Sequence, residues 1–237
     1  MDCLLGRAKP AELASVSPED FVSALGRHRT TAIIRCQDAA LAASAMAAAV
    51  RGGVRIVEFT LTTPGAYELI AEHARQDHPP VDGISRLVVG AGTVLTRDEL
   101  ERSIAAGARF VVSPVLDVDI VRAATEAGVA VLPGVHTPTE MLTAHRAGAP
   151  LVKLFPAPAG GPAWLRAVLA PLPMLKVVPT NGVDLDNIAA WLDAGAFAVG
   201  LVADIFRPQW LAERDFAAIE ARVVALRGTI AQGGKPS

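Results

Sequence analysis

The 237-residue chain is 51% hydrophobic and 19% charged, a composition typical of a globular protein with a large core and unlike that of disordered chains. A formal net charge of −2 and scattered arginines argue against a nucleic-acid partner. The two cysteines, Cys3 and Cys36, are too few for a disulfide framework and indicate a reducing, cytoplasmic environment. The apolar pair Leu4-Leu5 is too short for a signal peptide or a membrane span, so we expect no membrane partner.

A unit of strand, helix and small-residue turn repeats along the chain. A short helix is predicted around Pro18 to Arg27. Continuous apolar runs then predict eight strands, at 31–34, 54–60, 87–91, 109–113, 129–132, 151–155, 176–179 and 196–201. We expect one domain over residues 18–227, with flexible tails at 1–17 and 228–237.

The segments between the predicted strands carry helix signals at both ends. Their C-terminal ends coincide with glycines, which a left-handed helix cap favours: Gly53, Gly107, Gly128, Gly148 and Gly195. Their N-terminal ends are predicted from capping residues: Thr63-Pro64, Thr96 with Glu99, Thr137-Pro138 with Glu140, and Asp184.

Runs that are continuously apolar indicate strands buried on both faces, and regular alternation with helices indicates parallel, right-handed crossovers. These features predict an α/β fold, a (β/α)8 TIM barrel with a closed, parallel, eight-stranded sheet and an extra N-terminal helix under its bottom. A doubly wound open sheet is the alternative, but no glycine fingerprint follows the first strand.

In such a barrel the active site lies at the C-terminal ends of the strands. The polar and special residues expected there are Arg35, Cys36, Glu58, Thr60, Thr62, Thr93, Ser113, Pro114, His136, Lys153, Phe155, Thr180, Asn181 and Gly200.

Lys153 gives the strongest functional signal, because the chain has four lysines against eighteen arginines and this one lies within an apolar strand. Desolvation favours the free amine, which can attack a ketone and form a Schiff base. The alternative is a structural core lysine that extends its amine to water or pairs with a carboxylate. Lys176 begins its strand at the opposite end and is predicted to be an ordinary solvated residue.

Glu58, near the end of the second predicted strand, is expected to point into the same cavity. A carboxylate there can move the protons that Schiff-base formation and C–C cleavage require. A structural ion pair with Lys153 is the alternative, and the two roles are compatible.

The five histidines are dispersed and no metal-ligand spacing is present, which disfavours a metal-dependent enzyme. We therefore expect neither a metal nor another cofactor. His136 alone falls at the catalytic end of a strand, where it is either a substrate contact or an ordinary loop histidine.

Six motifs, in order, resemble the class I 2-keto-3-deoxy-6-phosphogluconate / 4-hydroxy-2-oxoglutarate (KDPG/KHG) aldolases over most of residues 20–227. They are Val57-Glu58-Phe59-Thr60-Leu61, Gly90-Ala91-Gly92-Thr93-Val94-Leu95, Val112-Ser113-Pro114, Leu132-Pro133-Gly134, Val152-Lys153-Leu154-Phe155-Pro156 and Pro179-Thr180-Asn181-Gly182.

The resemblance implies a metal-free lyase of carbohydrate metabolism that cleaves a 2-keto-3-deoxy or 4-hydroxy-2-oxo acid to pyruvate and an aldehyde, usually as a homotrimer. It makes Lys153 the Schiff-base lysine and Glu58 the general acid–base. The residues implied to shape the pyruvate pocket are Thr93, Pro114, Phe155 and Thr180.

Three departures from the family pattern leave the substrate open. The gluconate-type enzymes have an arginine where this chain has Thr62; Arg35 can replace it, as in the galactonate-type enzymes. The phosphate-binding Gly-Gly pair reads Asn181-Gly182, and the glycine-serine turn reads Gly200-Leu201-Val202-Ala203. The turn at Ala159-Gly160-Gly161-Pro162 can still offer N–H donors, so phosphorylated and unphosphorylated substrates both remain candidates. Two alternative functions remain: a different Schiff-base lyase or a decarboxylating relative, and a non-catalytic or diverged barrel that binds a small keto acid.

Overall fold

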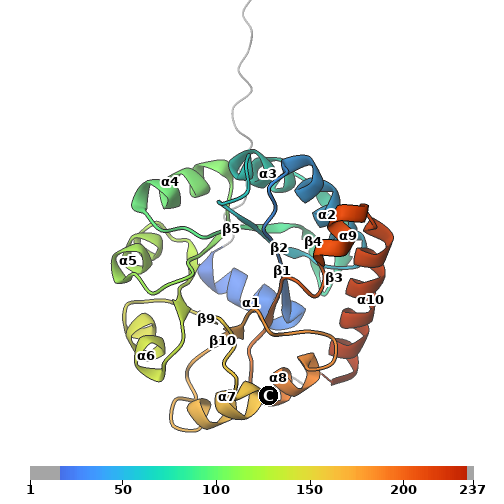
Figure 1. Cartoon of the computed structure of the whole chain (residues 1–237). Coiled ribbons are helices and arrows are strands. Elements are labelled where there is room, and N and C mark those ends of the chain that lie inside the picture. Colours follow the sequence, from blue (N-terminus) through green and yellow to red (C-terminus); the bar gives the residue numbers. More distant parts are fainter. Residues whose placement is uncertain (1–16, 234–237) are drawn as a thin grey trace, which may run out of the picture.

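In the computed structural model, which describes residues 17–233, helices form a ring around a set of mostly parallel strands (Figure 1). The helices are α1 (Pro18–His28), α2 (Ala39–Arg51), α3 (Ala66–His73), α4 (Arg97–Ala106), α5 (Val118–Glu126), α6 (Pro138–Arg146), α7 (Gly161–Leu169), α8 (Ile188–Asp193), α9 (Pro208–Glu213) and α10 (Phe216–Gly233). The strands are β1 (Thr30–Ile34), β2 (Ile56–Thr60), β3 (Asp77–Val81), β4 (Ile84–Arg86), β5 (Val88–Gly92), β6 (Phe110–Val112), β7 (Ala130–Leu132), β8 (Gly134–Val135), β9 (Val152–Leu154), β10 (Val177–Pro179) and β11 (Val199–Leu201).

Each predicted strand segment overlaps a strand, but the prediction of a closed eight-stranded sheet is wrong. The strands form an open, parallel six-stranded sheet in the order β11-β1-β2-β5-β6-β7, and a separate three-stranded sheet in the order β10-β9-β8. A single isolated bridge, Thr180 to Gly200, lies between the second sheet and β11. The predicted N-terminal helix is confirmed as α1.

Two prolines account for the interruptions. The Pro133 carbonyl accepts from the Lys153 N–H, so the Pro133 nitrogen also faces β9, where it has no hydrogen to donate. The Thr180 N–H donates to Leu154 of β9, so the nitrogen of the preceding residue, Pro179, faces β11 and again lacks a hydrogen. The ladder therefore breaks at the two edges of the three-stranded sheet.

Most of the predicted helix ends are confirmed. All five glycines that were assigned to helix C-termini have a positive φ. The capping boxes at Thr96 and Thr137 are formed in full. Two assignments were wrong: Gly65, not Thr63, precedes α3, and Asn187, not Asp184, precedes α8.

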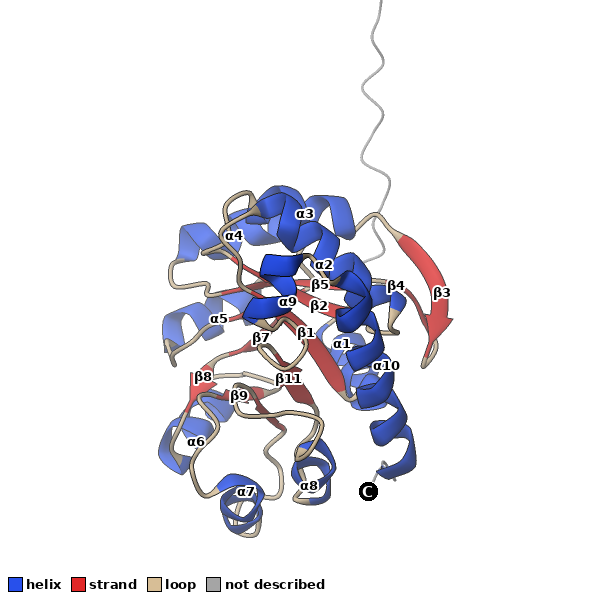
Figure 2. Cartoon of the chain, turned by 45° about the vertical axis from the view of Figure 1, so that its right-hand side comes forward, coloured by secondary structure: helices blue, strands red, loops and turns tan. Residues whose placement is uncertain are grey.

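The antiparallel hairpin of β3 and β4 was not predicted. Its turn residues, Asp82 and Gly83, have φ values of 52° and 77°, the left-handed conformation that tight hairpin turns require. The Asp-Gly pair between Val81 and Ile84 was therefore a usable signal in the sequence. Figure 2 shows the hairpin projecting from one side of the molecule, on the same side as α1.

The core has two parts. A large cluster fills the space between the strands and the surrounding helices and includes Val57, Phe59 and Val152. A smaller cluster fills the interior between the strands and α1, where the rings of Phe21 and Phe110 stack with their centroids 4.6 Å apart. Helix α1 thus covers the N-terminal ends of the strands.

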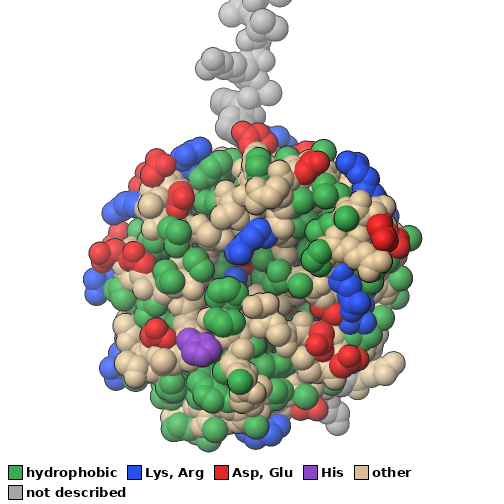
Figure 3. Space-filling view, in the orientation of Figure 1, with side chains coloured by type: hydrophobic (Ala, Val, Ile, Leu, Met, Phe, Trp, Pro, Cys, Tyr) green, Lys and Arg blue, Asp and Glu red, His purple; other side chains and the backbone are tan. Residues whose placement is uncertain are grey.

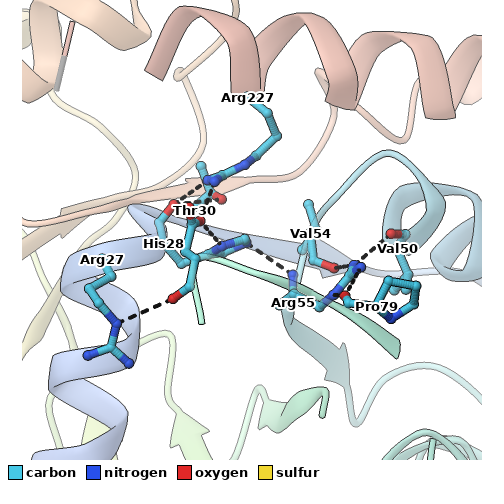
Figure 4. A network of polar contacts seen from close by, with 9 residues as sticks. Arg27, His28, Thr30, Val50, Val54, Arg55, Pro79 and Arg227 are labelled. Atoms are coloured by element: carbon cyan, nitrogen blue, oxygen red, sulfur yellow. Dashed lines mark hydrogen bonds and ion pairs between the residues drawn. The ribbon is translucent and has the colours of Figure 1, made fainter. Parts of the chain in front are cut away.

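A buried polar network holds these ends together (Figure 4). The His28 side chain, which is 0% exposed, contacts Asp82 through Nδ1 at 2.8 Å, and its Nε2 accepts from the Arg55 backbone N–H at 3.0 Å. Arg227 of α10 binds both Asp82 and the His28 carbonyl. The Arg55 guanidinium binds the carbonyls of Val50, Val54 and Pro79. The network joins α1, β2, the hairpin and α10.

This network predicts a loss of stability in mild acid. Burial, then the charge of Arg227, lowers the pKa of His28 to about 4, although Asp82 opposes the shift. The unfolded chain binds the proton near pH 6.5, so the unfolding free energy should fall as the pH drops from 6.5 towards 4, by about 3 kcal/mol. Urea unfolding at several pH values measures this. The dependence of the unfolding free energy on pH should diminish in His28→Gln. It should persist in His145→Gln, which changes an exposed histidine.

Helix α10 continues to Gly233 and buries Ile230, beyond Gly228, where the predicted tail begins. Of the predicted N-terminal tail, residues 1–16 lie outside the described residues. Among residues 17–233, no helix combines the length and apolar character that a membrane span needs.

Candidate active site

Lys153 and Glu58 both point into the interior of the strand assembly. Side chains alternate along a strand, and Ile56 of β2 and Leu151 before β9 belong to the inner cluster, whereas Val57 and Val152 belong to the outer one. Glu58 and Lys153, each two residues further on, therefore lie on the inner side. They sit one layer closer to the C-terminal ends of the strands.

The side chains of Lys153 and Glu58 lie close together without a direct hydrogen bond between them. The Lys153 Nζ lies 3.9 Å from Glu58 Oε1, with side chains 11% and 2% exposed, respectively. This distance is too long for a hydrogen bond, and Glu58 Oε1 is a buried oxygen without a donor. Nζ also lies 5.2 Å from the centre of the Phe155 ring. An amine and an unsatisfied carboxylate oxygen thus face the same enclosed space.

The protonation of Glu58 is set by opposing effects. Burial raises the pKa of this carboxyl group, while the nearby positive charges of Lys153 and then Arg35 lower it. Arg35 directly follows β1 and is exposed. A buried carboxyl group whose pKa is raised above its usual value, next to a positive charge, is suited to give and take protons.

Space for the Glu58 carboxyl group is provided by Gly92 of β5. A Cβ atom at this position would lie 2.0 Å from Glu58 Oε1. Gly90, two residues earlier, makes room for the Phe110 ring, which would lie 2.3 Å from a Cβ there. Gly92 was not among the predicted site residues, although glycine inside an apolar strand often marks the close approach of another group.

The two glycines predict separable effects. Gly92→Ala displaces a flexible carboxyl group and should lower kcat about 10²-fold, because small displacements of a catalytic group are costly. Gly90→Ala instead forces the stacked Phe110 ring to move and should destabilise the fold by about 1–3 kcal/mol. Steady-state kinetics and urea unfolding on both variants test this pair. Equal loss of stability in both, with activity of the folded fraction retained, would contradict the role of Gly92.

Hydroxyl groups connect the loops after β1 and β2. Thr60 Oγ1 lies 3.0 Å from Thr62 Oγ1 and 3.4 Å from Thr63 Oγ1. Thr63 Oγ1 in turn accepts a hydrogen bond from the Cys36 backbone N–H at 3.2 Å. The segment that carries Arg35 is thereby attached to the strand that carries Glu58. Of the predicted site residues, Thr62 is exposed and part of this network.

The other predicted site residues lie at the same ends of the strands. Thr93 follows β5 with a φ of 63°, and Pro114 follows β6, its carbonyl packed against Gly134. Thr180 Oγ1 occupies the space beside Gly200, 2.3 Å from where a Cβ would lie. Asn181 and Gly182 are exposed in the next turn, both with a positive φ. Their positions agree with the predicted end of the fold, and their roles remain predictions.

Figure 3 shows the face on which the strands end, since Figures 1 and 2 place α1 and the hairpin on the far side. Uncharged side chains dominate this face. A basic group lies near its centre, and most of the acidic groups visible in this view lie towards the periphery. The centre of this face is therefore positive, which favours an anionic group such as a carboxylate.

The fold and the buried amine–carboxylate pair are those of an α/β enzyme that can act on a carbonyl compound. The family model "KDPG and KHG aldolase" matches residues 22–222. The chain belongs to this family and is an aldolase, a carbon–carbon lyase that releases pyruvate and an aldehyde.

The names of similar proteins agree with this assignment. The chain is 36% identical to the 2-dehydro-3-deoxy-6-phosphogalactonate aldolase of Escherichia coli K12 over 146 residues, which cover 61% of this chain and 71% of the relative. It is 37% identical to the 2-dehydro-3-deoxy-phosphogluconate aldolase of Treponema pallidum over 173 residues, covering 71% and 78%.

Solved structures give the same result. A native KDPGal structure superposes with a TM-score of 0.76 at 29% identity, covering 86% of this chain and 95% of the other. The KDPG aldolase of Legionella pneumophila, with pyruvate captured as a covalent carbinolamine intermediate, has a TM-score of 0.75 at 26% identity, covering 88% and 97%.

Proposed function

We propose that Lys153 is the Schiff-base lysine of this aldolase and that Glu58 is its general acid–base. The observation that carries the proposal is a buried amine 3.9 Å from a buried carboxylate oxygen that has no hydrogen-bond donor. A purely structural ion pair would be expected to use that oxygen in a direct hydrogen bond.

The proposed reaction begins when the Lys153 amine attacks the C2 carbonyl of the keto acid and forms a carbinolamine. Glu58 protonates the departing hydroxyl group, water leaves and an iminium forms. Glu58, now ionised, removes the proton from the C4 hydroxyl group. The C3–C4 bond breaks, its electrons move into the iminium, and the aldehyde departs. Protonation of the enamine at C3 and hydrolysis then release pyruvate and the free lysine.

The surrounding residues support binding of a keto acid. Arg35 supplies a positive charge near Glu58, and we assign it to the substrate carboxylate, a role in which Thr62 can add a hydroxyl group. Phe155 lies beside the reactive amine. Thr93, Pro114 and Thr180 are proposed to complete the pyruvate pocket. Asn181, Gly182 and Gly200 are proposed to lie along the rest of the substrate.

Reductive trapping tests the proposal. Incubation with pyruvate and borohydride should add the mass of a reduced pyruvate adduct to the peptide that contains Lys153. Pyruvate binding without an adduct would instead indicate a non-catalytic protein that binds a keto acid. Loss of activity in EDTA would instead indicate that a bound metal, and not a Schiff base, acts as the electron sink.

The assembly and location of the enzyme are further parts of the proposal. We propose a cytoplasmic homotrimer, on the basis of the low cysteine content and the resemblance to the family. Light scattering on the purified protein gives the mass of the assembly.

A further inference from the structure

We propose that the aldehyde half of the substrate is an uncharged, hydroxylated chain, and that His136 accepts a hydrogen bond from one of its hydroxyl groups. This inference rests on the proposed function, which places C2 at Lys153 and the carboxylate at Arg35. Arg35 follows β1, so the rest of the substrate extends towards the loops after β8, β9 and β10, on the Lys153 side of the site.

His136 occupies the first position after β8, next to the lysine strand. Val135 pairs with Leu154, so His136 lies opposite Phe155, whose ring is beside Nζ. Its backbone N–H donates to Glu140 Oε2 at 2.8 Å, within the capping box that begins α6. The imidazole is exposed, and its ring centroid lies 6.5 Å from that of Trp164, with the planes 26° apart. These contacts therefore hold the ring in a defined place at the C-terminal ends of the strands.

The hydrogen bonding of the ring indicates what it can recognise. Nδ1 lies 3.1 Å from the Pro156 carbonyl oxygen. A carbonyl can only accept, so Nδ1 carries the hydrogen. In the neutral imidazole Nε2 is then an acceptor. An acceptor suits a hydroxyl donor and does not suit the oxygens of a phosphate or carboxylate.

The charges of the neighbouring loops also favour an uncharged aldehyde half of the substrate. Residues 156–160, after β9, carry no charged side chain. The segment after β10 contributes Asp184 and Asp186, which are acidic. The segment after β11, residues 202–207, contributes Asp204 and a cation, Arg207, that lies 3.3 Å from Asp204. Arg222 of α10 also binds Asp204. Together these described segments and Arg222 hold three aspartates against two arginines, so an anionic tail would meet no net positive charge there.

The test is synthesis from pyruvate and four aldehydes: glyceraldehyde, glyceraldehyde 3-phosphate, glyoxylate and propanal. We expect kcat/KM for glyceraldehyde to exceed that for both anionic aldehydes about tenfold, since an uncompensated charge opposes their binding. His136→Ala should lower the preference for glyceraldehyde over propanal by about 3- to 10-fold, the effect of one hydrogen bond. His136→Gln, which keeps an acceptor, should restore part of it. His145→Ala should not change it.

Two results would overturn the inference: a preference for either anionic aldehyde, or an equal loss for glyceraldehyde and propanal in both His136 variants. Borohydride trapping of the wild-type enzyme with pyruvate distinguishes a failure of the proposed function from a failure of the proposed aldehyde preference. Failure to trap refutes the proposed function, whereas normal trapping with the wrong aldehyde preference refutes only the proposed tail.

Discussion

Replacing Lys153 by alanine should abolish the reaction, with kcat reduced by roughly 10⁴- to 10⁶-fold, as is found when the nucleophile of a covalent mechanism is removed. Lys153→Arg should be as inactive, because a guanidinium keeps the charge next to Glu58 but does not become a free amine at neutral pH. The measurement is steady-state cleavage together with borohydride trapping by mass.

Lys176 provides the matched control. It is exposed and precedes β10, at the opposite end of the strands, and its Nζ lies 5.9 Å from the centre of the Phe197 ring. Lys176→Ala should retain activity and trapping. If Lys153→Ala still forms the reduced adduct, or if the adduct maps to Lys176, the assignment of the nucleophile is wrong.

Changing Glu58 to glutamine should lower kcat by roughly 10²- to 10⁴-fold, the usual contribution of a positioned acid–base group. Glutamine keeps the shape of the side chain and loses the proton transfer. Trapping with pyruvate should become slow, because dehydration of the carbinolamine also requires an acid. Stopped-flow trapping and steady-state kinetics would show both effects.

The same variant should be more stable than the wild type at alkaline pH. Burial raises the pKa of Glu58, so the folded protein holds this proton more tightly than the unfolded chain does. Above the ordinary carboxyl pKa, ionisation therefore costs folding free energy, and this cost is absent in Glu58→Gln. The difference in unfolding free energy should be present at pH 8 and vanish near pH 4. Glu68→Gln, at an exposed position on α3, should show no comparable gain.

Local signals in the sequence predicted much of the fold. Alanine-rich stretches that end in glycines, such as Gly107 and Gly148, marked helix ends because a left-handed residue is needed there. Thr96 and Thr137 marked helix starts through reciprocal capping bonds. Such signals involve only a few neighbouring residues, so they can be read without knowledge of the tertiary structure.

Closure of the sheet could not be predicted in the same way. It depends on which side of a strand each N–H group faces, and Pro133 and Pro179 matter only because their nitrogens face a neighbouring strand. Neither the pairing nor this orientation is written in the local sequence. The prolines were visible, but their consequence was not.

For the site, the sequence identified the lysine strand and the glutamate strand, and the structure brings Lys153 and Glu58 within 3.9 Å. The unpartnered Glu58 oxygen, the room left by Gly92 and the ring contact between His136 and Pro156 required coordinates. Each depends on side-chain packing between segments far apart in the chain, which spacing alone does not report.

The polar network around His28 and the amine of Lys153 lie at opposite poles of the strands. The segments that we propose to recognise the substrate can therefore accept substitutions, such as threonine at position 62, without loosening the contacts between the first and last helices. A protein organised in this way can explore new aldehydes while keeping one scaffold. When proteins of this kind change their substrate, the substitutions should therefore lie at the C-terminal ends of the strands and not at the N-terminal ends.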